Sequence, residues 1–121
     1  MVWSGSSSAQ DSEEYPFTPV EAFICNYNDR QGRDDLDDTI ERFNDWMAEN
    51  DRSGYIAWIL TPQSYTAEQD CDFIWLGAAP DYRAAGAGKQ NWLENGGAIQ
   101  QAFDEVASCN SHVNAASLQV R

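Results

Sequence analysis

Basic residues, histidine and long apolar runs are all scarce in this sequence of 121 residues. Lys and Arg number 7 against 20 Asp and Glu, so the formal net charge is -13. A surface this negative is repelled by nucleic-acid phosphates and by anionic lipids, which excludes both as expected partners. No stretch approaches the about 18 continuous apolar residues of a membrane-spanning helix. The N-terminus lacks the basic and apolar regions of a signal peptide, so we expect a soluble, cytoplasmic protein unless a signal was removed.

Cysteine is scarce too, and Cys25, Cys71 and Cys109 are widely spaced. No Cys-x-x-Cys pair occurs, and no cluster of His, Cys and carboxylates has metal spacing, so we expect neither a metal nor another cofactor. The odd number of cysteines argues against a disulfide framework. Cys25 and Cys109 are most simply small buried hydrophobic residues. One bridge between Cys25 and Cys109 stays open as the alternative.

Two short apolar runs, residues 55–61 and 72–77, form the centre of the chain, and each has a tryptophan in its middle. An apolar content of 42% is typical of a globular domain. The runs have the length and composition of β-strands, and a polar, turn-rich segment separates them. They therefore predict the central hairpin of a small sheet.

Helical and extended patterns flank this hairpin on both sides. A strand over 20–28 and a helix from Asp34 or Asp35 to Asn50 are expected before it. A helix from near 89–92 to about 108, broken at Gly96-Gly97, and a strand over 111–120 are expected after it. The order β-α-β-β-α-β predicts an α+β, ferredoxin-like domain over 20–121: a four-stranded antiparallel sheet with both helices on one face.

Two segments have compositions that argue against regular structure. Residues 1–19 are rich in Ser, Gly, Pro and acidic residues, which indicates a tail or linker. Residues 78–89 are rich in small residues and are expected to be irregular for part of their length. Within them Asp81, Tyr82 and Arg83 are expected in a loop, either solvated or acting as a lid.

Both faces of the predicted hairpin are apolar. Trp58 opposes Ala57 and Ile59 across one strand, and the strand around Trp75 shows the same pattern, with Ile74 and Leu76. One layer of helices covers only one face of a sheet, and a large exposed apolar face is unusual for a monomer. We therefore expect a homodimer in which two sheets pair face to face.

The chain resembles the dimeric α/β-barrel superfamily over residues 20–121. The resemblance rests on the order of the elements, the length of the chain and the strands that are apolar on both faces. That superfamily includes antibiotic-biosynthesis monooxygenases and muconolactone-isomerase-like enzymes, and its domains pair their sheets. Some segments are also similar to those of an uncharacterised bacterial family of that fold: 25–28, 75–77, 86–88 with Trp92, and Cys109 with His112. The resemblance implies a dimeric α/β barrel and supplies no activity.

Three polar residues are candidates for catalysis. His112 is the one histidine, so proton transfer by histidine near neutral pH would use it; the alternative is a surface residue at a helix end. Asn26 and Asn28 would orient a carbonyl or phenol in a pocket, or they would end the strand and bond the following turn. We expect no second strong acid or base beside His112.

Several aromatic residues and one cysteine are candidates for binding a flat apolar ligand, although most aromatic residues at such spacing belong to a core. They are Trp58, Trp75, Trp92, Tyr55 and Cys25. Two functional hypotheses follow. The first is a cofactor-independent oxygenase or isomerase that acts on an apolar or aromatic carbonyl compound. The second is a non-catalytic module for small-ligand binding or assembly. Half of a longer, two-domain parent is a third possibility.

Overall fold

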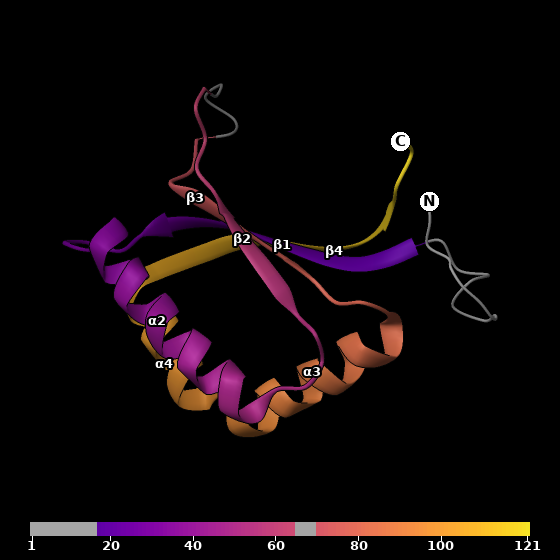
Figure 1. Cartoon of the computed structure of the whole chain (residues 1–121). Helices are drawn as coiled ribbons and strands as arrows, with labels where there is room; N and C mark the ends of the chain where they lie inside the picture. Colours follow the sequence, from indigo (N-terminus) through magenta and orange to yellow (C-terminus); the bar gives the residue numbers. More distant parts are fainter. Residues whose placement is uncertain (1–16, 65–69) are drawn as a thin grey trace.

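Three helices pack beneath a four-stranded sheet in the computed structural model, which describes residues 17–64 and 70–121 (Figure 1). The elements follow one another along the chain as β1 (Phe17–Tyr27), α2 (Arg33–Asn50), β2 (Ile56–Leu60), β3 (Phe73–Ala78), α3 (Tyr82–Asn95), α4 (Gly97–Val106) and β4 (Ala107–Leu118). β1 thus begins three residues earlier than expected, and the rest of the expected tail lies outside the described residues.

The sheet has the strand order β2-β3-β1-β4, and every neighbouring pair is antiparallel. All the described helices lie on the same side of it (Figure 1). This is the ferredoxin-like α+β architecture that the sequence predicted. The register sets residues from different strands side by side, and one row runs across the sheet from Ile59 through Trp75 and Phe23 to His112.

The core lies between one end of the sheet and helices α2 and α4. Its fully enclosed members are Cys25, Leu36, Phe73 and Val106. α2 reaches this core because its apolar stripe faces the sheet. The Asp35 carboxylate accepts a hydrogen bond from the Gly32 N–H at 2.9 Å, which satisfies one backbone donor at the start of α2.

The helix that was predicted to begin near 89–92 begins earlier, because α3 starts at Tyr82, and the irregular part of 78–89 is limited to residues 79–81. The Asp81 carboxylate accepts a hydrogen bond from the Ala84 N–H at 2.7 Å and caps the helix. This cap and the alanines that follow offset the cost of glycine inside a helix. Asp81, Tyr82 and Arg83 are therefore a helix start and not a loop.

The expected break at Gly96-Gly97 is confirmed. α3 ends at Asn95, and α4 begins at Gly97. A Cβ on Gly96 would lie 2.6 Å from the Trp92 ring, so the chain turns tightly against that side chain. The break leaves α3 free to run beneath the sheet in a different direction from α4 (Figure 1).

A disulfide joins Cys25 on β1 to Cys109 on β4. β4 starts immediately after α4, four residues earlier than expected, and this places Cys109 opposite Cys25 in the register. The interpretation of both cysteines as simple buried hydrophobic residues is therefore wrong, and the alternative of a bridge is correct. Cys71 is buried and free.

No helix in residues 17–64 and 70–121 has the length and apolar character needed to cross a bilayer.

Candidate functional site

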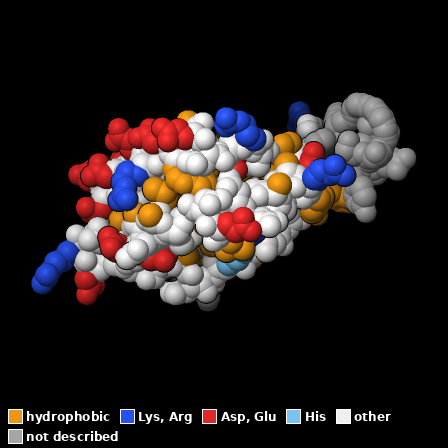
Figure 2. All heavy atoms as spheres, turned by 90° about the horizontal axis from the view of Figure 1, so that it is seen from below, with side chains coloured by type: hydrophobic (Ala, Val, Ile, Leu, Met, Phe, Trp, Pro, Cys, Tyr) orange, Lys and Arg blue, Asp and Glu red, His pale blue; other side chains and the backbone are white. Residues whose placement is uncertain are grey.

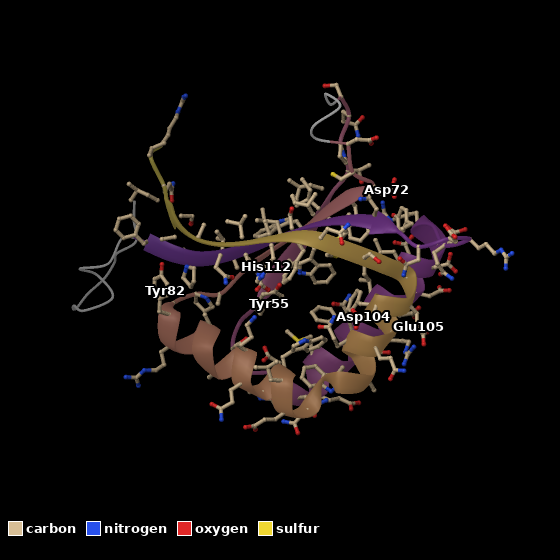
Figure 3. All side chains as sticks on the ribbon, turned by 180° about the vertical axis from the view of Figure 1, so that it is seen from behind. Tyr55, Asp72, Tyr82, Asp104, Glu105 and His112 are labelled. Atoms are coloured by element: carbon tan, nitrogen blue, oxygen red, sulfur yellow. A yellow bond between two sulfur atoms is a disulfide. The ribbon has the colours of Figure 1, made fainter. Side chains whose placement is uncertain are left out.

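A cavity of about 810 Å³ lies between the sheet and the helices. Its volume falls within the range of about 300 to 1,000 Å³ that is usual for small-molecule sites. The sheet contributes one side of it through β1, β3 and β4, and helices α2, α3 and α4 contribute the other. His112, Tyr55 and Asp104 lie on this helical side of the sheet (Figure 3).

The cavity exists because α3 presents small side chains to the sheet. Ala84, Ala85 and Gly88 line the cavity, and no residue of α3 is fully buried. A Cβ on Gly88 would lie 3.1 Å from the Ser53 hydroxyl, so glycine lets the helix approach the turn before β2. Small residues on a helix face leave space that larger ones would fill with packed side chains.

Aromatic side chains form a wall of the cavity. Phe43 lies edge-on to Trp75, with ring centroids 5.2 Å apart, and to Trp92 and Phe103 at 5.8 Å each. Such edge-to-face arrangements are favourable and fix the rings relative to one another. The wall is therefore a preformed apolar surface.

The sheet side of the cavity carries a chain of hydrogen bonds. The Trp75 Nε1–H donates to the Tyr55 hydroxyl at 2.8 Å, and that hydroxyl donates to Glu21 Oε2 at 2.8 Å. Gly77 lies opposite Glu21 in the register of β1 and β3. A Cβ on Gly77 would overlap the Tyr55 hydroxyl, so the absence of a side chain there lets Tyr55 reach Glu21. Burial raises the pKa of Tyr55, and the nearby Glu21 carboxylate raises it further. Tyr55 therefore stays protonated and holds Glu21 in place.

His112 lies beside Glu21 on the same face of the sheet. Its ring stacks on Phe23, with centroids 4.0 Å apart and planes 5° from parallel. His112 Nε2 is 3.8 Å from Glu21 Oε1, which is close enough for an ion pair when the imidazole is protonated. The expectation that no second acid lies near His112 is therefore wrong.

The sequence analysis did not identify Glu21 as a site residue, although part of the pattern that indicates it is present in the sequence. Alternation along the first strand places Glu21 on the same face as Phe23 and Cys25, with which it shares the cavity. A carboxylate among apolar residues on that face is unusual. Its neighbour His112 comes from β4, and only the register of β1 with β4 sets the two together.

The structure brings most of the candidate residues to this cavity. The ones that line it are His112, Tyr55, Trp75, Trp92 and Cys25. Trp58 does not line it; this side chain is 49% exposed on β2.

Asn26 and Asn28 do not line the cavity either, and both side chains bind backbone groups. The Asn28 amide donates to the carbonyl oxygens of Asp104 and Glu105, at 2.9 and 3.1 Å, and so holds the end of α4 to the end of β1. Asn26 Oδ1 accepts a hydrogen bond from the Asp72 N–H at 3.1 Å. The two amides thus lie at the end of the strand, as the alternative had it, but their side chains bind distant segments of the chain and not the turn that follows.

Among the described residues, no group of three or more His, Cys, Asp and Glu side chains is arranged to hold a metal ion. The polar residues that do lie together in the cavity are Tyr55, Glu21 and His112. Their side chains can form hydrogen bonds and transfer protons.

Comparison with known proteins identifies the fold. No family model and no curated protein sequence matches the chain. A crystal structure of a chlorite dismutase-like protein matches it with a TM-score of 0.51 and 10% sequence identity, over 83% of this chain and 43% of that one. The chain thus has a ferredoxin-like α+β fold, as the sequence predicted. It spans less than half the length of the protein that it matches.

Proposed function

We propose that the protein binds a small aromatic or apolar molecule in the cavity between the sheet and the helices. The observation that carries this proposal is the meeting of an aromatic wall and one polar line, Tyr55–Glu21–His112, in a cavity of about 810 Å³. Ligand sites typically combine an apolar lining with a few polar groups that fix orientation. The wall would hold the rings of the ligand, and the polar line would hold its heteroatom.

The indole N–H signals of the tryptophans test this binding by NMR. Phenols and aromatic ketones added to ¹⁵N-labelled protein should shift the signals of Trp75 and Trp92, which line the cavity. The signal of Trp58, outside the cavity, is the internal control and should stay in place. Shifts confined to Trp58, or no shifts at millimolar ligand, would contradict binding in the cavity.

A second function, proton transfer, is favoured by the distance of 3.8 Å between His112 Nε2 and Glu21 Oε1. Neutral His112 would take a proton from the carbon next to a ligand carbonyl, which leaves an enolate. Glu21 would stabilise the imidazolium that forms, and His112 would return the proton to the same or another carbon. This is the chemistry of a cofactor-independent isomerase that acts on an aromatic carbonyl compound; the oxygenase alternative has no comparable observation in its favour.

Exchange of hydrogen for deuterium tests the proton transfer without knowledge of the product. Phenylacetone in D₂O should exchange its α-hydrogens faster with the protein than without it. His112→Gln should slow this exchange about 100-fold or more, the usual contribution of a general base. Glu21→Gln should also slow it, whereas Glu105→Gln, the same change on the outer side of α4, should not. Unchanged exchange in His112→Gln would leave a binding protein without this chemistry.

We also propose that the protein forms a homodimer through the sheet face opposite the helices. Large apolar side chains are exposed there on both edge strands: Ile56 (56%), Trp58 (49%), Leu60 (40%) and Val113 (54%). A contiguous apolar face of this kind is typical of an interface. In a two-fold dimer this apolar face would pack against the same face of a second copy, so apolar side chains would meet apolar side chains.

A further inference from the structure

We infer that the ligand of the cavity carries a positive charge, as an organic ammonium ion does. This inference rests on the proposed binding function and adds the chemical class of the ligand. Glu21, Asp51 and Asp104 line the cavity, and Lys89 is the one Lys or Arg among the lining residues. The formal charge of the lining is therefore negative, and the charge of the whole chain, -13, has the same sign.

Glu21 is the group that would bind this charge. One of its carboxylate oxygens already accepts the Tyr55 hydroxyl at 2.8 Å. The other, Oε1, accepts no hydrogen bond from any residue in the described ranges, and His112 Nε2 lies 3.8 Å from it. The side chain is only 22% exposed, so water screens it less than a surface carboxylate. Glu21 thus offers a carboxylate oxygen that has His112 beside it but no hydrogen-bond donor within the described ranges, and a negative charge in the lining of the cavity.

The aromatic wall favours the same class of ligand. The faces of Trp, Tyr and Phe rings are negative and attract organic cations, most strongly where water is excluded. Trp75 and Phe43 lie in this wall, and Trp75 directs its N–H edge, not its face, at the Tyr55 that holds Glu21. An ammonium group at Glu21 would therefore have the carboxylate as its partner, and the organic part of the ligand would lie against the rings.

An anionic ligand fits the cavity less well. Lys89 on α3 and Asp104 on α4 are both exposed, so their charges are solvated, whereas the Glu21 side chain is only partly exposed. A carboxylate ligand would meet Glu21 on the sheet side and the negative field of the whole chain on its approach. Figure 2 looks onto the helical side of the molecule and shows many acidic side chains gathered at one end of it.

Three ligands of matched shape test the inference by titration calorimetry: 2-phenylethylamine, 2-phenylethanol and 3-phenylpropionate, all at pH 7 and at fixed salt. The amine should bind roughly tenfold more tightly than the alcohol, the advantage expected of a cation beside a carboxylate and aromatic rings. This comparison uses the native protein and so does not depend on the folding of any variant. Glu21→Gln should remove the preference, whereas Glu105→Gln changes the net charge equally and should keep it.

The possible outcomes separate this inference from the function on which it rests. If the amine and the alcohol bind equally, the binding function stands and the inference about charge is wrong. If 3-phenylpropionate binds most tightly, the ligand is an anion and Lys89 selects it. If the preference for the amine persists in Glu21→Gln and disappears at high salt, the overall charge of the chain causes it, and Glu21 is not the binding group. If none of the three binds, both proposals are contradicted.

Discussion

Tyr55 shows how one residue sets the geometry of the site. It precedes β2, and its ring crosses β3 over Gly77 to reach Glu21 on β1. Its hydroxyl accepts from Trp75 and donates to Glu21, so both hydrogen-bonding capacities are used. A buried hydroxyl with partners on both sides is fixed in orientation, and the carboxylate that it holds is fixed with it.

The pKa of Tyr55 gives a prediction for high pH. Its ordinary value is 10.0, and burial raises it, so this phenol keeps its proton after exposed tyrosines have lost theirs. Because the folded pKa is above the unfolded one, the stability that the protonated phenol contributes is complete below about pH 10 and is lost as the pH rises further. Burial also raises the pKa of Tyr27, so two tyrosines are expected to titrate late. Ultraviolet titration at 295 nm should show a late step that loses one tyrosine's amplitude in Tyr55→Phe and disappears in urea. A late step of unchanged amplitude in Tyr55→Phe would contradict this assignment.

At the scale of elements, a covalent bond adds to the pairing with β1 that positions β4. It is an edge strand, nearly all of its residues are exposed, and β1 is its one neighbour in the sheet. The register of the two strands shifts between Ile24 and Cys25, and the disulfide lies at this point. The bond therefore holds β4, and with it His112, against β1.

Removal of this bond should lower stability and loosen β4. Cys25→Ala with Cys109→Ala should reduce the free energy of unfolding by about 2 to 4 kcal/mol, a typical value for one disulfide. Amide exchange should rise most in β4, because β4 is an edge strand and would then be held by its pairing with β1 alone. Thiol counting provides the check on the bond itself: unfolded but unreduced protein should react at Cys71 alone. Three reactive thiols per chain would show that the bond does not form.

At the scale of the whole molecule, the two faces of the sheet differ in what covers them. The helical face encloses the cavity, and the other face exposes apolar side chains from β2 and β4. Burial of apolar area is the main favourable term in association, at about 25 cal/mol per Å² of apolar surface. The apolar face therefore predicts self-association, while the strongly negative charge of the chain limits contacts between copies elsewhere.

Sedimentation tests this prediction directly. The native protein should sediment at about twice the chain mass of 13.6 kDa at micromolar concentration. Ile56→Glu with Trp58→Glu places two charges on the exposed face and should shift the protein to monomer. Val120→Glu adds one charge at a residue that is 88% exposed beyond β4, and this control should remain dimeric. A native protein that sediments as a monomer would rule out the sheet-paired dimer.

Local patterns in the sequence were enough to predict the order of strands and helices, and therefore the class of fold. The apolar runs around Trp58 and Trp75 identified the hairpin of β2 and β3, although β2 lies at the edge of the sheet and not at its centre. The helical stripe that includes Leu36 and Phe43 identified α2. The break at Gly96-Gly97 was also evident, because glycine is poor in a helix interior. These features are local, since they depend on residues a few positions apart in the chain.

The composition of the site, in contrast, depends on tertiary structure. Glu21 and His112 come together because β1 and β4 pair in one register, and no local pattern specifies the register of strands so far apart in the chain. The same pairing joins Cys25 to Cys109 across a sequence separation of 84 residues. The cavity itself depends on where α3 packs, which its small residues permit but do not dictate. Local patterns fix elements, whereas the site depends on long-range pairing of those elements.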